Sequence, residues 1–198
     1  MEHWAYDEAP APLGLVPVEG RGSLPFALVH GESLLAAASW ALTTAGVRLY
    51  DLSVPFEQVR ERCREEDVDL VVHDPLCPLT PVEFLVEALE LARSTRAVVL
   101  GVRPVTDTVK EYDAQPDGSV RLGATVDREG LASLASPVVL PGTVVAALED
   151  LPTDDLGRLV LDLAARFPVR QLPAPALARR VVDAEDLQVL AALSSSRD

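Results

Sequence analysis

Short apolar runs alternate with helix-like stretches along the first half of the chain, and this alternation predicts an α/β domain. The runs with the length and composition of buried strands are residues 13–18, 47–50, 68–72 and 97–102. Helices are expected between them, at residues 34–44, 56–65 and 81–94. Strands that alternate with helices form βαβ units, so we expect a mostly parallel sheet.

Residues that favour helix ends mark the limits of several of these helices. Ser33 is expected to cap the helix at 34–44, and Gly46 to end it. Pro55 is expected at the first helical position of the next helix, where its missing N–H costs nothing. Asp183 is expected to cap a last helix at residues 184–193.

The pattern changes after residue 106, where an antiparallel hairpin is predicted within the α/β domain. Residues 107–112 and 120–125 read as strands around the turn sequence Pro116-Asp117-Gly118. Its apolar side chains need a partner to cover them: Val109, Tyr112, Val120 and Leu122.

The rest of the chain adds helices and a strand without a break into a second domain. Helices are expected at residues 143–149 and 154–167, and a strand at 169–172. The sequence contains no internal repeat and no linker. Residues 1–198 are therefore interpreted as a single domain, with residues 1–12 as a flexible lead.

Composition limits the classes of function. Hydrophobic residues make up 48% of the 198, enough for one sizeable core, and the net charge is -14. Such an acidic chain repels nucleic-acid phosphates and anionic membranes, so neither is an expected partner. Cys63 and Cys77 form no CxxC pair, and neither a membrane span nor a signal peptide is evident. We expect a cytoplasmic protein without a zinc site or a disulfide scaffold.

Loops at two predicted strand ends carry candidate binding residues. Gly20, Arg21 and Gly22 follow the first strand, where backbone N–H groups could hold a phosphate; a plain turn is the alternative. The longer glycine-rich phosphate-binding motifs are absent. Asp74 closes the strand at 68–72 and could hold Mg²⁺ or position an alcohol, and the alternative is an aspartate that caps its loop.

Other polar residues give weaker signals. His73 is expected to be packed rather than to bind a metal, and Cys77 to be a small buried side chain rather than a nucleophile. Arg128 could bind a phosphate with two hydrogen bonds or form a surface pair with Asp127. The residues alone therefore lead to an α/β domain with a candidate site for a phosphorylated small molecule at its strand ends.

A set of short segments spans nearly the whole chain in a defined order. They are Pro17-Val18-Glu19-Gly20-Arg21-Gly22, Pro25-Phe26-Ala27-Leu28, Val72-His73-Asp74, Pro104-Val105-Thr106-Asp107-Thr108-Val109-Lys110, Thr125-Val126-Asp127-Arg128, Thr153-Asp154-Asp155 and Asp183-Ala184-Glu185-Asp186-Leu187. In this order they resemble the 2-C-methyl-D-erythritol 4-phosphate cytidylyltransferase family. The segments at 104–110 and 125–128 are the most specific, because they lie at family spacing across the predicted hairpin.

The resemblance implies a Rossmann-like, mostly parallel sheet of the nucleotide-diphospho-sugar transferase type. It also implies a protruding β-hairpin dimerisation arm at 106–128 that embraces a second subunit, so that a homodimer completes the active site. The family transfers CMP from CTP to a phosphorylated tetrol, releases pyrophosphate and uses Mg²⁺, in isoprenoid precursor synthesis.

The resemblance also assigns roles to individual residues. Gly20, Arg21 and Gly22 fall in the nucleotide-binding loop, and Asp74 falls in the metal and acceptor region. Arg180 stands where the family has a phosphate-binding lysine, so it joins Asp74 as a catalytic candidate. The residues implied to bind the acceptor phosphate are Thr108, Arg128 and Thr153.

The chain departs from the family pattern in its nucleotide-binding half. Ser23-Leu24 lead directly to Pro25-Phe26, so the glycine loop is shortened, the arginine that follows it in the family is missing, and Phe26 replaces the catalytic lysine. Between Tyr50 and Val68 there is room for one helix only, so the segment that holds the base and ribose is missing. Each lost charged contact to a phosphate costs about 1.5–3 kcal/mol.

We therefore expect a catalytically impaired family member, a pseudoenzyme with a scaffold or regulatory role. One alternative is an active cytidylyltransferase in which Arg21 and Arg180 replace the lost phosphate contacts. The other is a module that binds a small phosphorylated metabolite through Thr108, Arg128 and Thr153. Mg²⁺ is expected as a cofactor only if the chain is active.

Overall fold

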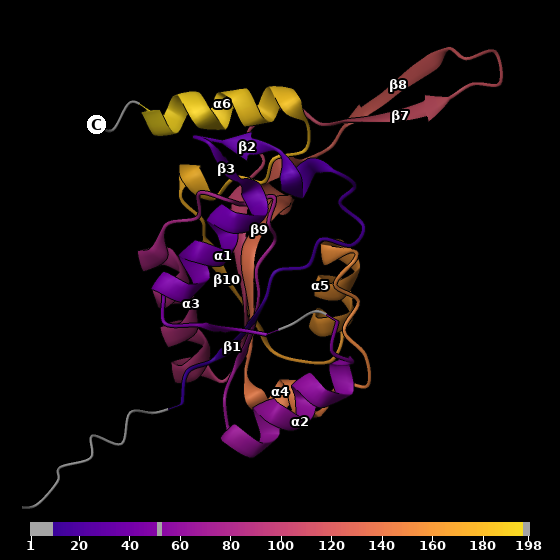
Figure 1. The fold of residues 1–198 in the computed structure, drawn as a ribbon. Helices are drawn as coiled ribbons and strands as arrows, with labels where there is room; N and C mark the ends of the chain where they lie inside the picture. The colour runs from indigo at the N-terminus through magenta and orange to yellow at the C-terminus, as the bar shows by residue number, and fades with distance from the viewer. Residues whose placement is uncertain (1–9, 51–52, 196–198) are drawn as a thin grey trace, which may run out of the picture.

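A six-stranded mixed sheet forms the centre of the computed structural model, which describes residues 10–50 and 53–195 (Figure 1). The strand order is β10-β6-β9-β5-β1-β4, and β9 alone runs antiparallel to its neighbours. The strands are β1 (Leu13–Leu15), β4 (Arg48–Leu49), β5 (Leu70–Val72), β6 (Val98–Pro104), β9 (Ala132–Leu140) and β10 (Val169–Pro173). The predicted α/β class with a mostly parallel sheet is confirmed. The expected lead at 1–12 falls largely outside the described residues.

The helices lie close to their predicted positions. They are α1 (Leu34–Thr44), α2 (Phe56–Glu66), α3 (Val82–Thr95), α4 (Gly142–Ala146), α5 (Leu156–Ala164) and α6 (Ala184–Ser195). The Ser33 hydroxyl accepts a hydrogen bond from the Ala36 N–H at 3.1 Å, and the Asp183 carboxylate accepts one from the Asp186 N–H at 2.8 Å. Both predicted caps are therefore confirmed.

Two predicted helix starts are corrected. Pro55 has an extended ψ of 142° and precedes the first helical residue of α2, so the expectation that it occupies the first helical position is wrong. The helix predicted from residue 154 begins at Leu156. Asp155 stays outside it as a cap, because its carboxylate accepts hydrogen bonds from the N–H groups of Gly157 and Arg158.

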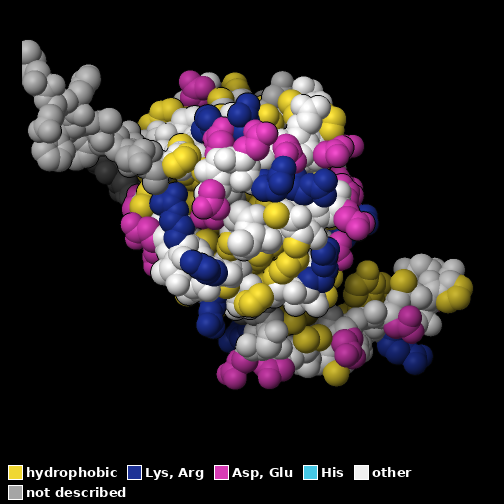
Figure 2. Space-filling view, turned by 90° about the horizontal axis from the view of Figure 1, so that it is seen from below, with side chains coloured by type: hydrophobic (Ala, Val, Ile, Leu, Met, Phe, Trp, Pro, Cys, Tyr) yellow, Lys and Arg dark blue, Asp and Glu magenta, His cyan; other side chains and the backbone are white. Residues whose placement is uncertain are grey.

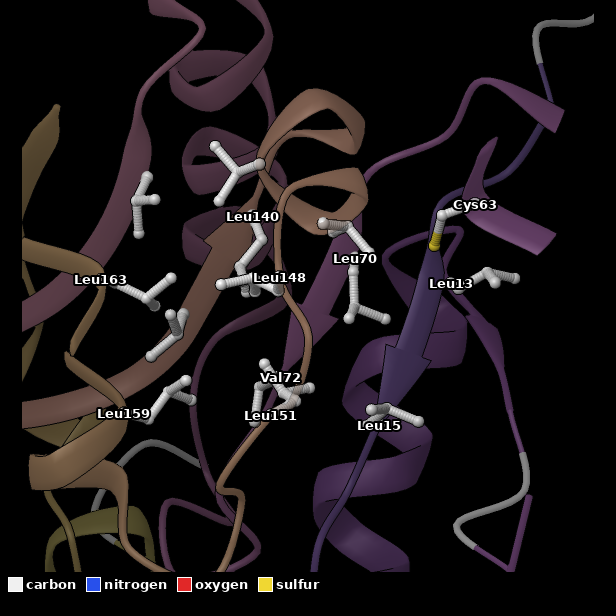
Figure 3. Packing of buried hydrophobic residues seen from close by; sticks show 14 of the residues in the cluster. Leu13, Leu15, Cys63, Leu70, Val72, Leu140, Leu148, Leu151, Leu159 and Leu163 are labelled. Carbon is white, nitrogen blue, oxygen red and sulfur yellow. The ribbon is translucent and has the colours of Figure 1, made fainter. Parts of the chain in front are cut away.

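Helices cover both faces of the sheet. α2, α4 and α5 pack on one face, and α1 and α3 pack on the other (Figure 1). On the first face, Leu70 and Val72 of β5 are fully buried and lie near Leu148 and Leu151 (Figure 3). Burial of a side chain of this size contributes about 1.5–3 kcal/mol, so these layers hold the strand ends in place.

The sequence pattern did not predict β9. Ser133, Ser136 and Pro137 interrupt its apolar run, yet residues 135–140 are buried between β5 and β6. A small hairpin of β2 (Leu28–Val29) and β3 (Glu32–Ser33) was missed as well. Both depend on pairing with partner strands rather than on a regular local pattern.

The predicted hairpin is present and projects from the body of the molecule (Figure 1). Among the described strands, β7 (Lys110–Ala114) and β8 (Val120–Thr125) pair only with each other, and every residue of both is exposed. Tyr112 and Leu122 lie opposite each other and are each 70% exposed. The hairpin at 106–128 is called the arm below.

Charge is distributed over the surface in both signs. On the face seen from below, acidic and basic side chains are interspersed (Figure 2). The net charge of -14 therefore does not gather into one patch on that face. In the described part of the chain, the helices are too short or too polar to cross a membrane.

Candidate functional site

The ends of β1 and β5 meet where open α/β sheets usually bind ligands. The chain leaves β1 for β4 on one side and returns to β5 on the other, which makes a topological switch point. Arg21 follows β1, and Asp74 follows β5. The sheet thus brings the glycine loop and the predicted acidic residue together.

The Asp74 carboxylate is fully buried and engages two guanidinium groups. Arg21 Nε donates to Oδ1 at 2.8 Å, and Arg180 Nε donates to Oδ2 at 2.9 Å. The Leu76 N–H also donates to Oδ1, at 3.0 Å. Burial alone would raise the pKa of Asp74, but the charge of Arg21 and the hydrogen bond from Arg180 hold it below its ordinary value. The group is therefore ionised at neutral pH. Arg21, Asp74 and Arg180 are called the ion-pair cluster below.

The Arg21 side chain is built into the interior. It is 2% exposed, and its Nη1 donates to the carbonyl oxygens of Glu19 at 2.6 Å and Thr153 at 2.9 Å. Gly20 has a φ of 76°, and a Cβ there would lie 2.3 Å from the Asp154 carbonyl oxygen. The glycine loop therefore packs against the 153–154 segment, and its arginine points inward.

The Arg180 side chain is only partly enclosed. It is 34% exposed, compared with 2% for Arg21. Within the described chain, only its Nε makes a hydrogen bond. Its Nη1 and Nη2 groups therefore keep N–H donors that a ligand can use.

His73 and Ser136 form a neutral polar contact behind Asp74. His73 Nδ1 lies 2.6 Å from Ser136 Oγ, which also accepts a hydrogen bond from the Asp74 N–H at 2.8 Å. Burial lowers the pKa of His73 to about 4, despite the nearby Asp74 charge. Burial also raises the pKa of the Cys77 thiol to about 12. Both residues are packed as predicted. Ser136 was missed because it lies on β9.

The family resemblance implies Mg²⁺, and the ion-pair cluster does not fit a protein-bound Mg²⁺. Mg²⁺ needs carboxylate oxygens free of competing cations, whereas both Asp74 oxygens accept from guanidinium groups. No group of three or more His, Cys, Asp or Glu side chains within residues 10–50 and 53–195 could hold a metal ion. As arranged, the site carries more positive than negative charge.

Comparisons with known proteins identify the family to which the chain belongs. No family model matches the chain. A relative from Frankia casuarinae, described as 2-C-methyl-D-erythritol 4-phosphate cytidylyltransferase, is 36% identical over 142 residues, which are 69% of this chain and 51% of that protein. A relative of the same description from Saccharopolyspora erythraea is 27% identical over an alignment 226 positions long, which covers 91% of this chain and 98% of that protein. The chain belongs to the 2-C-methyl-D-erythritol 4-phosphate cytidylyltransferase family. The first of these matches spans only about half of its relative.

Solved structures of this family have the same fold. The cytidylyltransferase from Thermus thermophilus matches 94% of this chain and 99% of its own, with a TM-score of 0.65 and 19% identity. The 4-diphosphocytidyl-2C-methyl-D-erythritol synthase from Anaerococcus prevotii matches with a TM-score of 0.64 and 14% identity. The mixed, mainly parallel sheet with its hairpin is thus the family fold.

The residues that the family resemblance assigns to the acceptor phosphate lie in two separate places in this chain. Thr153 lies at the ion-pair cluster, where its carbonyl accepts from Arg21. Thr108 and Arg128 lie exposed at the root of the arm, and Arg128 Nη1 donates to the Thr106 carbonyl oxygen at 2.5 Å. In the described chain, neither makes a hydrogen bond or ion pair with the ion-pair cluster.

Two features of the chain differ from the family pattern where the resemblance places the nucleotide. Phe26 ends a short 3-10 helix, Leu24–Phe26, and is 60% exposed where the family resemblance places a lysine. A cavity of about 300 Å³ is lined by apolar side chains together with the hydroxyl groups of Ser53 and Thr153, and its described lining contains no basic side chain. Between β4 and α2, the described residues form neither a helix nor a strand.

Proposed function

We propose that this chain is a non-catalytic member of the cytidylyltransferase family, with a binding, scaffold or regulatory role. The observation that supports the proposal is the ion-pair cluster, in which Asp74 already occupies Arg21 and the Nε of Arg180. An active enzyme would need Arg21 and Arg180 to make the phosphate contacts that this chain is missing.

The energetics of Arg21 oppose its recruitment by a nucleotide. Removing one partner of a buried ion pair costs up to about 3–5 kcal/mol. Withdrawal of Arg21 would leave the buried Asp74 carboxylate with Arg180 as its one remaining cation in the cluster. One new hydrogen bond to a charged phosphate returns only about 1.5–3 kcal/mol. The cluster therefore favours its own closed arrangement over a triphosphate. The competing proposal, an active enzyme that uses Arg21 and Arg180, requires Arg21 to leave Asp74, whereas Arg180 can offer its Nη donors from its present position.

CTP with Mg²⁺ is expected to bind more weakly than millimolar and to release no pyrophosphate above background in the presence of the phosphorylated tetrol. The exposed Phe26, the buried Arg21 and the net charge of -14 all oppose a polyanion. The Phe26→Lys variant is expected to remain inactive, since one preorganised donor is worth about 10²–10³ in rate and the other contacts are still missing. Calorimetry measures CTP binding, and a coupled assay measures pyrophosphate release by the wild type and by Phe26→Lys. A relative that has the lysine serves as the positive control. A micromolar dissociation constant that Arg21→Ala abolishes would establish the active alternative.

We further propose one nucleotidyltransferase-like domain over residues 1–198 that forms a homodimer through the arm and resides in the cytoplasm. The arm supports dimerisation because a two-stranded hairpin is marginally stable alone and Tyr112 and Leu122 are exposed on it. A partner subunit would also bring a second copy of Thr108 and Arg128 to the complex.

The double variant Tyr112→Glu/Leu122→Glu is expected to shift the protein from dimer to monomer at micromolar concentration. Two charges would then enter the contact that buries these side chains. The control is Leu161→Glu on α5, because Leu161 is 72% exposed and lies off the arm. Light scattering reports the mass of each variant. A wild-type monomer, or a double variant that stays dimeric, would contradict dimerisation through the arm.

A further inference from the structure

A pocket of about 650 Å³ lies between α1 and the segment that leads into α3. On the α1 side it is lined by the small side chains Ala36, Ala37 and Ala41 and by the indole of Trp40. The hairpin of β2 and β3, which lies beside α1, adds to the lining (Figure 1). This space is called the α1 pocket below. It shares no lining residue with the ion-pair cluster or with the 300 Å³ cavity.

The walls of the α1 pocket are largely apolar. Trp40 is 66% exposed, so a large aromatic surface is available to a ligand. The opposite side chains include Pro78 and Pro81, whose backbones have no N–H to offer. The Thr80 hydroxyl already donates to a carbonyl oxygen of its own loop at 2.8 Å. Such walls suit the apolar part of a small molecule.

Glu32 gives the α1 pocket a negative charge that the described side chains do not neutralise. The described lining contains no lysine or arginine, and the Glu32 carboxylate makes no hydrogen bond or ion pair with the described residues. His30 Nε2 lies 2.6 Å from Ser194 Oγ and is engaged there. The N-terminus of α1, two residues after Glu32, carries only about half an elementary charge. A cation therefore complements this end of the pocket.

The backbone on both sides of Glu32 is held in place. His30 and Gly31 have φ angles of 51° and 83°, as a tight two-residue hairpin turn requires. Val29 pairs with Glu32 across that turn. Ser33, the next residue, caps α1 through its hydroxyl. The position of the carboxylate beside the pocket is thus set by the hairpin and by the start of the helix.

We propose that the α1 pocket binds a small organic ammonium ion, a protonated amine or quaternary ammonium group carried on an apolar body. The face of a tryptophan attracts such cations, and Glu32 supplies a counter-charge. The volume lies within the range of small-molecule sites. The net charge of -14 also draws cations toward the protein. A metal ion does not fit, because it needs several oxygen ligands and the described lining offers one carboxylate. The proposal goes beyond the proposed lack of catalysis and does not depend on it.

Benzyltrimethylammonium and neopentylbenzene, a neutral molecule of the same shape, test the requirement for a positive charge. The chain has two tryptophans, Trp4 and Trp40, so the Trp4→Phe variant leaves Trp40 as its one tryptophan. Titration of that full-length variant at constant ionic strength is expected to give a saturable change in Trp40 emission. The cation is expected to bind at least about fivefold more tightly than the neutral molecule, since it alone gains the ion contact and the attraction of the indole face.

Substitution of the carboxylate tests the site itself. Glu32→Gln is expected to weaken binding of the cation about three- to fivefold, as for an exposed ion pair, and to leave binding of the neutral molecule unchanged. The matched control is Glu90→Gln, because Glu90 is exposed on α3 and lies outside the pocket lining. This control should bind the cation as the unsubstituted glutamate does.

Three results would overturn the proposal. They are equal affinity for the cation and the neutral molecule, an unchanged affinity of Glu32→Gln for the cation, and a Trp40 emission that does not respond to the cation. The comparison of the two ligands requires no change at Glu32, so it tests the pocket even if Glu32→Gln does not fold. CMP transfer by the chain would contradict the proposed lack of catalysis and leave this proposal standing.

Discussion

The Asp74→Asn variant is expected to unfold with a free energy about 3–5 kcal/mol lower than that of the wild type. Asparagine keeps the shape of the side chain but leaves the Arg21 guanidinium, which is 2% exposed, without a counter-charge. Arginine cannot escape by losing its proton. Arg180 loses its partner as well, but it is partly exposed and can turn toward water. Urea unfolding followed by circular dichroism measures the loss.

Two further variants separate the buried charge from other effects of the substitution. Asp162→Asn removes an aspartate whose partner, Arg158, is 65% exposed, and should cost at most about 1 kcal/mol. The double variant Arg21→Gln/Asp74→Asn should be more stable than Asp74→Asn alone, because no uncompensated charge stays buried. If Asp74→Asn costs no more than Asp162→Asn, the cluster does not stabilise the fold as described.

Stability is expected to fall by about 3 kcal/mol as the pH drops from about 6.5 to about 4, through His73 alone. The pKa of His73 is lowered by burial from 6.5 to about 4, so the folded protein keeps this imidazole neutral across that range. The unfolded chain binds a proton there, and each unit of pH below 6.5 therefore favours unfolding. The free energy of unfolding therefore has its full value at pH above 6.5, the pKa in the unfolded chain, and it decreases until the pH reaches about 4, the pKa in the folded protein. Asp74, whose pKa is also lowered, extends the loss to more acidic pH.

The His73→Gln variant isolates this contribution, because glutamine does not titrate. Its unfolding free energy should depend less steeply on pH between 4 and 6.5 than that of the wild type, whatever constant cost the substitution adds. His30→Gln is the control, since His30 is exposed. Equal pH slopes for wild type and His73→Gln would show that His73 is not held neutral by the fold.

The ion-pair cluster affects which charged groups of the family site are free to contact a ligand. In an enzyme that transfers a nucleotide, positive groups must be free to face developing charge on the phosphates. Here Arg21 faces a carboxylate of the same chain, and Phe26 presents an apolar surface. Arg180, whose side chain is more exposed than that of Arg21, lies with Arg103 at the arm root. The closed cluster therefore supports the proposed lack of catalysis.

The sequence by itself determined the elements that depend on local pattern. Apolar runs and helix caps placed most of the main helices, and Pro116-Asp117-Gly118 placed the hairpin. Asp74 and the glycine loop were found because a polar residue that closes a buried strand is a local signal. The family resemblance came from short segments of the same kind, and the comparisons bear it out.

Only the tertiary structure decided what those residues contact. β9 has a broken apolar pattern and is a strand because β5 and β6 pair with it on both sides. Arg21 is separated from Asp74 by 53 residues and Arg180 by 106, and no periodicity encodes such pairs. The same holds for Arg103 and Arg179, which line one pocket where β6 and the segment before α6 converge. Contacts between distant residues depend on the packed sheet, and that packing directs one arginine into the interior and others toward a pocket.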